Sequence, residues 1–207
     1  MKKKVLVVID VQNDFITGVL HNDEAAAKVP AIVEEIKNFD GDAIFVTMDT
    51  HDEDYMETKE GQRLPVPHCI EYTDGWRIEP TVQKALREKA VELLDRKFEA
   101  QFKEETRDDN DGAGLYVVEK HTFGYDSWLA LLNDTLDIDN LYLDTDELEI
   151  TVVGFDTEYC VISNVFGLKA AFPNARIMVK KSCVAGADKD AAQKALDVMA
   201  TCHIDII

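Results

Sequence analysis

The sequence predicts an α/β protein of three layers, with a mostly parallel sheet of roughly six strands covered by helices on both faces. Two observations support this fold class. Short apolar runs rich in β-branched residues alternate along the chain with stretches in which apolar residues recur every three to four positions. Polar side chains follow several of the apolar runs directly, as is common at the carboxyl edge of a parallel sheet.

The first strand is predicted at residues 5–9, an apolar run bounded by lysines and by Asp10. Such a run is typical of a strand buried on both faces. The same reasoning predicts the other strands at residues 43–48, 115–119, 149–153, 176–179 and 203–206.

Helices are predicted between these strands from apolar positions that share one helical face. The first face contains Val29, Ile32 and Ile36. The second starts at Pro80 and continues through residue 94. The others cover residues 126–132 with Asp126 as the cap, residues 161–172 after the turn that holds Cys160, and residues 195–199.

In two segments the apolar residues do not recur at the regular spacing of a helix or a strand. Residues 52–77 combine prolines, histidines and aromatic residues, and a loop of this length in a folded protein is usually functional, so we interpret it as a binding loop. Residues 103–114 are mostly charged, and this composition predicts a solvent-exposed surface segment.

The composition limits the class of protein. A chain of 207 residues with 46% hydrophobic content suits one domain over residues 1–207. The net charge of −19 argues against nucleic acid and anionic membrane as partners. Four cysteines without a leader-like segment indicate free thiols in a reducing, cytoplasmic environment. A homo-oligomer remains open.

Three reactive groups, Asp10, Lys120 and Cys160, each follow or end a predicted strand. In a parallel sheet these ends lie along one edge, so the carboxylate, ammonium and thiol can meet in one crevice. Cys160 also lies where a helix begins, and the helix terminus favours a nucleophilic thiolate. Taken singly, each has an ordinary alternative as a turn residue, a solvated lysine or a core cysteine.

A second cluster contains metal-binding residue types. Asp49 and His51 follow the strand at residues 43–48, and Glu60 and His68 lie in the long loop. Imidazole and carboxylate ligands at this spacing suit Zn²⁺, Mn²⁺ or Fe²⁺, with Zn²⁺ the preferred ion. Ordinary loop histidines are the competing interpretation.

Five separated motifs resemble those of the isochorismatase-like cysteine hydrolases, and within that family the nicotinamidases. They occur at residues 8–15, 49–51, 64–69, 120–123 and 153–161. The resemblance covers nearly the whole chain, and the motifs follow the family's order.

The resemblance implies a catalytic triad of Asp10, Lys120 and Cys160 and metal ligands at Asp49, His51 and His68, with Glu60 as a fourth ligand. It also implies an oxyanion hole formed by the backbone N–H groups of Asp156 and Cys160, next to a cis peptide bond between Phe155 and Asp156.

Two aromatic residues are candidates for substrate binding: Phe15 can stack on a planar ring, and Tyr159 adjoins the nucleophile. Nicotinamidases commonly have a tryptophan three residues before the histidine of the Pro-His-Cys turn, and this chain has Pro65 there.

The predicted function is a metal-assisted cysteine amidohydrolase that acts through a thioester, with nicotinamide converted to nicotinate and ammonia as the leading reaction. Another small amide or a carbamoyl compound is the nearest alternative substrate. An isochorismatase-type vinyl ether hydrolase is a further alternative, although those enzymes generally lack the nucleophilic cysteine. A non-catalytic binding protein on the same scaffold is the last.

Overall fold

The computed structural model describes residues 2–101, 114–136 and 148–207. The acidic segment predicted at residues 103–114 lies outside the described residues, apart from Gly114. No helix within the described ranges is both long enough and apolar enough to cross a membrane.

A parallel sheet of six strands forms the centre of the molecule, in the order β3-β2-β1-β4-β5-β6. The predicted fold class is confirmed. The strands are β1 (Lys3–Ile9), β2 (Ala43–Asp49), β3 (Leu115–Lys120), β4 (Leu148–Gly154), β5 (Arg176–Val184) and β6 (Asp205–Ile206). Every residue of β2 is buried, which explains why apolar residues predominate in this strand.

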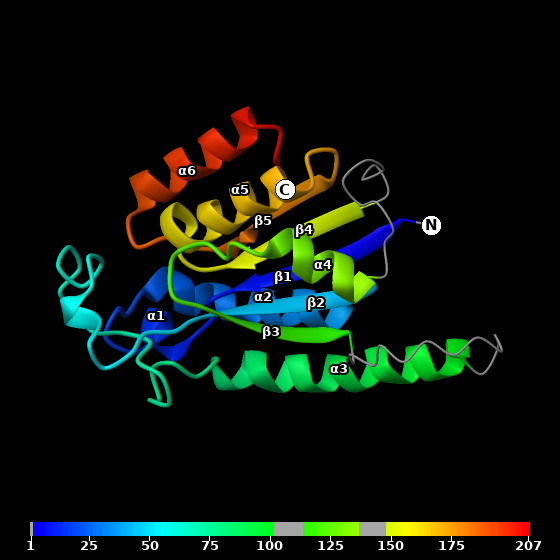
Figure 1. Cartoon of the computed structure of the whole chain (residues 1–207), viewed down its shortest axis with the longest axis horizontal. Helices are drawn as coiled ribbons and strands as arrows, with labels where there is room; N and C mark the ends of the chain where they lie inside the picture. The colour runs from blue at the N-terminus through cyan, green and yellow to red at the C-terminus, as the bar shows by residue number, and fades with distance from the viewer. Residues whose placement is uncertain (1, 102–113, 137–147) are drawn as a thin grey trace.

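Helices cover both faces of this sheet (Figure 1). One face carries α2 (Asp23–Asn38) and α3 (Pro80–Gln101), and the other carries α4 (Trp128–Leu136), α5 (Ile162–Ala171) and α6 (Lys189–Thr201). Each face has its own buried apolar cluster, because alternate residues of the buried strands point to opposite sides. The N-terminus of α2 is capped by Asn22, whose side chain accepts from the N–H groups of Glu24 and Ala25.

Several element boundaries differ from the sequence prediction. β5 continues to Val184 instead of ending at residue 179. β6 is limited to two residues and begins only at Asp205, because His203 adopts a left-handed conformation with φ of 66° and cannot start the strand. Asp126 is not the cap of α4, which begins at Trp128; its carboxylate instead accepts from Ser127 Oγ at 2.7 Å.

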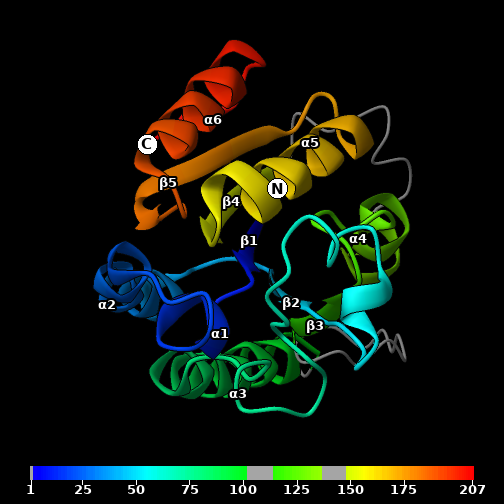
Figure 2. The same ribbon diagram turned by 90° about the vertical axis from the view of Figure 1, so that its left-hand side faces the viewer.

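The strand order reverses between β1 and β4, since the chain first extends the sheet through β2 and β3 and later through β5 and β6. The carboxyl ends of these two strands therefore flank the position where open α/β sheets bind ligands. Figure 2 shows the loops that leave this edge. The close approach of β4 to β1 requires Gly154, because a Cβ atom there would collide with the carbonyl oxygen of Ile9.

Candidate active site

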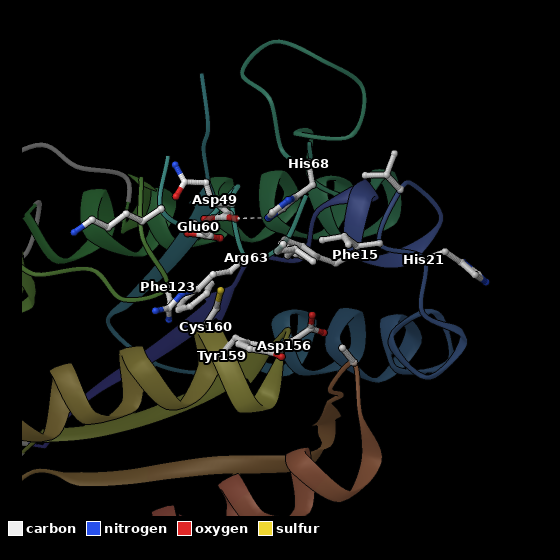
Figure 3. A pocket seen from close by; sticks show the side chains of 16 residues that line it. Phe15, His21, Asp49, Glu60, Arg63, His68, Phe123, Asp156, Tyr159 and Cys160 are labelled. Atoms are coloured by element: carbon white, nitrogen blue, oxygen red, sulfur yellow. Dashed lines mark ion pairs between the residues drawn. The ribbon is translucent and has the colours of Figure 1, made fainter. Parts of the chain in front are cut away.

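A cavity of about 1120 Å³ lies at the carboxyl edge of the sheet. Figure 3 shows Asp49 and His68 on one side of it and Asp156, Tyr159 and Cys160 on the opposite side. Its walls come from the turns after β1, β2 and β4 and from the loop at residues 52–77. The loop that the sequence predicted to bind a ligand therefore forms part of the cavity wall.

The ammonium of Lys120, the last residue of β3, lies between a carboxylate and a thiol. Lys120 Nζ is 2.7 Å from Asp10 Oδ2 and 3.5 Å from Cys160 Sγ, and all three side chains are buried. Asp10 is fixed from its other side by Thr47, whose Oγ1 donates to Asp10 Oδ1 at 2.6 Å. The structure thus brings together the three reactive groups that the sequence places at separate strand ends.

Electrostatic interactions set the charges of this group. Burial alone would favour a neutral amine, but Asp10, the Cys160 sulfur and Asp49 hold the pKa of Lys120 well above its ordinary value. Burial raises the pKa of Asp10, and the charge of Lys120 opposes that rise. Lys120 therefore stays cationic, as expected, beside a carboxylate with increased proton affinity.

Cys160 lies in a five-residue π-turn (Thr157–Val161) that leads directly into α5, and it is 4% exposed. Burial, followed by the charge of Asp10, raises the pKa of the Cys160 thiol well above its ordinary value, and Lys120 only partly opposes this. The expectation of a thiolate near neutral pH therefore needs correction. The resting group is a thiol, which must transfer its proton before it can attack.

The predicted metal ligands form a buried cluster. Asp49 ends β2, His51 follows it, and His68 comes from the long loop; their ligand atoms lie within 4.8 Å of one another. Asp49 Oδ2 is 3.1 Å from His51 Nε2 and 3.4 Å from His68 Nε2. His68 Nδ1 donates to the Val66 carbonyl oxygen at 2.8 Å, which orients Nε2 toward the cluster.

Glu60 completes this cluster less tightly, with Oε1 at 3.9 Å from His51 Nε2. That oxygen is buried and has no hydrogen-bond partner among the described residues. Burial, together with the charge of Asp49, raises the pKa of Glu60. A divalent cation would satisfy both the unpartnered oxygen and the crowded carboxylates. One or two carboxylates with two imidazoles therefore fit a divalent transition metal.

The metal cluster and the reactive group share a contact, because Lys120 Nζ also donates to Asp49 Oδ1 at 3.0 Å. Despite burial, hydrogen bonds from His51 and His68 and the charge of Lys120 lower the pKa of Asp49. Asp49 is therefore ionised and faces both groups at once.

The turn after β4 has the cis peptide bond between Phe155 and Asp156 that the family resemblance implies. Within this turn the N–H of Thr157 donates to the Ala185 carbonyl, and those of Tyr159 and Val161 donate to the Asp156 carbonyl. The Asp156 side chain lines the cavity and is 8% exposed. Only the backbone of Asp156 was predicted from the sequence to take part in the site.

Aromatic side chains border the cavity on two sides. Phe15 is buried, and its ring contacts the His68 ring edge-on at 5.8 Å between centroids. Tyr159 is 46% exposed and lies 5.5 Å from the Phe123 ring. Both predicted substrate-binding residues are thus in the cavity wall, together with Phe123, which lies in one of the family motifs but was not predicted to bind substrate.

Two buried amides hold the site residues in place, and neither was identified from the sequence. Gln12 Nε2 donates to the Asp49 carbonyl at 2.8 Å, and its Oε1 accepts from the Asp49 N–H at 2.8 Å. Asn164 Nδ2 donates to the carbonyls of Cys160 at 2.8 Å and Phe123 at 3.0 Å. A polar residue within an otherwise apolar helix face was the available signal for Asn164.

Solved structures share this fold over nearly the whole chain. A pyrazinamidase of Pyrococcus horikoshii in complex with zinc has 19% identity and a TM-score of 0.69, covering 99% of this chain and 98% of that one. A nicotinamidase/pyrazinamidase from Bacillus subtilis has 21% identity and a TM-score of 0.70, covering 99% and 98%. An N-carbamoylsarcosine amidase from Thermoplasma acidophilum has 23% identity and a TM-score of 0.62, covering 99% and 95%.

The sequence comparisons give a family. No curated protein matches the chain. Residues 4–105 match the model of the isochorismatase domain, and this range contains β1, β2 and all four candidate metal ligands. The family match and the shared fold agree with the motifs found in the sequence. Residues 4–105 therefore match the isochorismatase domain, and nearly the whole chain shares the fold of these amidases.

Proposed function

We propose that the protein is a metal-assisted cysteine amidohydrolase that cleaves a small amide through a thioester intermediate, with nicotinamide as the leading substrate. The observation that carries the proposal is the position of Lys120 Nζ, 2.7 Å from the Asp10 carboxylate and 3.5 Å from the Cys160 sulfur, at a ligand-sized cavity. A base, a nucleophile and a fixed cation are the groups that acyl transfer from an amide needs.

In the first step Asp10 accepts the thiol proton, and Cys160 Sγ attacks the amide carbonyl. The raised pKa of Asp10, caused by burial, suits this transfer because it brings the proton affinity of the carboxylate closer to that of the thiol. Asp10 then gives the proton to the departing ammonia as the C–N bond breaks. Water hydrolyses the thioester, which releases the acid and restores the thiol.

The tetrahedral intermediate carries an oxyanion, which the backbone N–H groups of Asp156 and Cys160 would stabilise. The N–H groups of Thr157, Tyr159 and Val161 in the same turn already donate to carbonyl oxygens, which supports this assignment. Lys120 holds the Asp10 carboxylate and offsets negative charge on sulfur during attack.

Asp49, His51 and His68 would hold the metal, with Glu60 as a fourth ligand. When bound, such an ion would position the substrate through a ring nitrogen or a water molecule and would act as a Lewis acid. Zn²⁺ is the ion we propose, since the donors are imidazole and carboxylate.

A carbamoyl compound is the second candidate substrate, and the residue at position 65 favours it. Pro65 offers no aromatic ring to pack on a planar substrate, and the cavity of about 1120 Å³ does not restrict the substrate to a single-ring amide. The structural neighbours include an N-carbamoylsarcosine amidase as well as nicotinamidases.

The test is ammonia release from nicotinamide, pyrazinamide, N-carbamoylsarcosine and simple alkanamides, together with mass spectrometry of acid-quenched protein. We expect turnover of at least one amide and an acyl adduct on Cys160. Cys160→Ala should abolish both, whereas Cys183→Ala, a buried cysteine on β5 that does not line the cavity, should retain them. Normal turnover in Cys160→Ala, or no turnover of any amide by the metal-loaded protein, would refute the proposal.

A further inference from the structure

The proposed mechanism leaves one buried carboxyl group without a task. The Asp156 side chain is 8% exposed, and its Oδ1 has no hydrogen-bond partner in the described part of the chain. Figure 3 shows the carboxyl group directed toward the part of the cavity that Phe15 borders. A buried carboxylate without a partner is costly, so a native site that contains one usually serves a ligand.

A structural role does not account for this side chain. Asp156 occupies the capping position of the turn Thr157–Val161, yet its side chain makes no capping hydrogen bond. The neighbouring acid Glu158 behaves differently, because its Oε1 accepts from the Asp188 N–H at 2.8 Å and so joins two loops. Asp156 faces the cavity and Glu158 does not line it.

No cation of the described chain neutralises Asp156. The Lys120 ammonium is already shared by Asp10 and Asp49. His68 lies across the cavity among the metal ligands, and the His21 ring pairs with Asp23. Lys59 and Arg63 line the cavity from exposed positions in the loop and form no ion pair with Asp156.

The charge around Asp156 is predominantly negative. Burial, followed by the charges of Glu158 and Asp10, raises the pKa of Asp156 to about 7, and His68 only partly opposes this. A ligand that brings a positive charge or a strong hydrogen-bond donor would reverse this effect and ionise the group. The cavity that Asp156 lines has a volume of about 1120 Å³, which leaves room for a substituent of the substrate.

We propose that Asp156 determines specificity by binding a cationic nitrogen, such as a primary ammonium group, on the part of the substrate that is not cleaved. The inference rests on the proposed amidohydrolase function and narrows its substrate class. The backbone N–H of Asp156 would hold the oxyanion at the scissile carbon while its side chain holds the ammonium. A short amide with an amine at its other end fits this arrangement.

The test uses ω-aminoalkanamides with four to six carbons, each paired with the alkanamide of equal length that ends in a methyl group. Monoamides of the corresponding dicarboxylic acids supply an anionic member. Binding is measured by calorimetry on metal-loaded Cys160→Ala protein, so that it does not depend on turnover. Hydrolysis by the wild-type protein is measured separately by ammonia release.

One chain length should bind about ten- to a hundredfold more tightly with the ammonium than with the methyl end, the range of a buried hydrogen bond to a charged group. This ratio should fall close to one when Asp156→Asn is added to Cys160→Ala. Adding Glu158→Gln instead, which removes a nearby carboxylate outside the cavity, should keep the ratio.

Equal binding of the two ends at every length, preference for the carboxylate end, or a ratio that survives Asp156→Asn would overturn the inference. These outcomes are distinct from a failure of the proposed function. Preferential binding of the amine that depends on Asp156, without hydrolysis of any amide, would support the amine site and refute the amidohydrolase. Hydrolysis without any preference for the amine would support the amidohydrolase and refute the amine site.

Discussion

Asp10 and Asp156 are two buried carboxyl groups at the ends of adjacent strands, and they differ in what surrounds them. Asp10 is ion-paired with Lys120 at 2.7 Å and accepts a hydrogen bond from Thr47, whereas Asp156 Oδ1 has no partner in the described structure. Burial raises the pKa of both. Burial alone therefore does not assign a role: we propose that the partnered group takes part in proton transfer and that the unpartnered one binds a ligand.

Substitution of the partnered carboxylate should have the largest effect. Asp10→Asn keeps the shape of the side chain but removes the base, so kcat/KM on a confirmed amide should fall by about 10²–10⁴. Thermal unfolding of the variant separates this loss from misfolding. Turnover close to wild type in a folded Asp10→Asn protein would show that another group accepts the Cys160 thiol proton. Asp10 and Asp156 would then no longer differ in the way proposed.

Removal of the cation should be the next largest effect. Lys120→Met keeps most of the volume and should slow acylation by a factor of about a hundred or more. Lys120 lowers the pKa of the Cys160 thiol, which burial and Asp10 raise, so the pH profile of Cys160 alkylation should move to higher pH in the variant. An unchanged profile would contradict the assigned role of Lys120 in this region.

The metal cluster contacts the Asp10–Lys120 pair through Asp49. Its predicted ligands can be tested by comparing His68 with another histidine of the cavity wall. His68→Ala should weaken Zn²⁺ binding by about a hundredfold or more, since even residues that only hydrogen-bond to a metal's ligands contribute about 10–100-fold. His21→Ala, which also lines the cavity but pairs with Asp23, should keep the metal content. Metal analysis of proteins purified without chelators gives the result, and equal zinc loss in both variants would argue against the site.

The prediction for the unpartnered carboxyl concerns the free energy of unfolding and not turnover. The pKa of Asp156 is about 7 in the folded protein and near 3.8 when unfolded, so the native state binds the extra proton and stability falls as pH rises between these values. Asp156→Asn should therefore be more stable than wild type at pH 8 by up to about 4 kcal/mol, the value that a pKa difference of this size sets, with the gap closing near pH 4. Urea unfolding without ligand measures this, and a gap that does not depend on pH would mean that Asp156 is already neutralised.

The sequence by itself determined the fold and the reactive groups. Continuous apolar runs marked strands buried on both faces, and the residue after each run was placed at the carboxyl edge, which is why Asp10, Asp49 and Lys120 could be named. The long loop was identified as a binding segment from its composition. The residues at which strands begin and end were predicted less well, as β5 and β6 show, because strand ends depend on pairing with neighbouring strands.

Only the tertiary structure decided how these groups behave. The rise in the Cys160 pKa and the sharing of Lys120 between two carboxylates depend on burial and on distances between residues far apart in the chain. The same holds for Gln12 and Asn164, whose hydrogen bonds join segments that the sequence does not relate. Asp156 was visible as a residue of a motif, but its missing partner became apparent only once the surrounding side chains were in place, since pattern and spacing determine where a side chain lies along an element and not what it meets there.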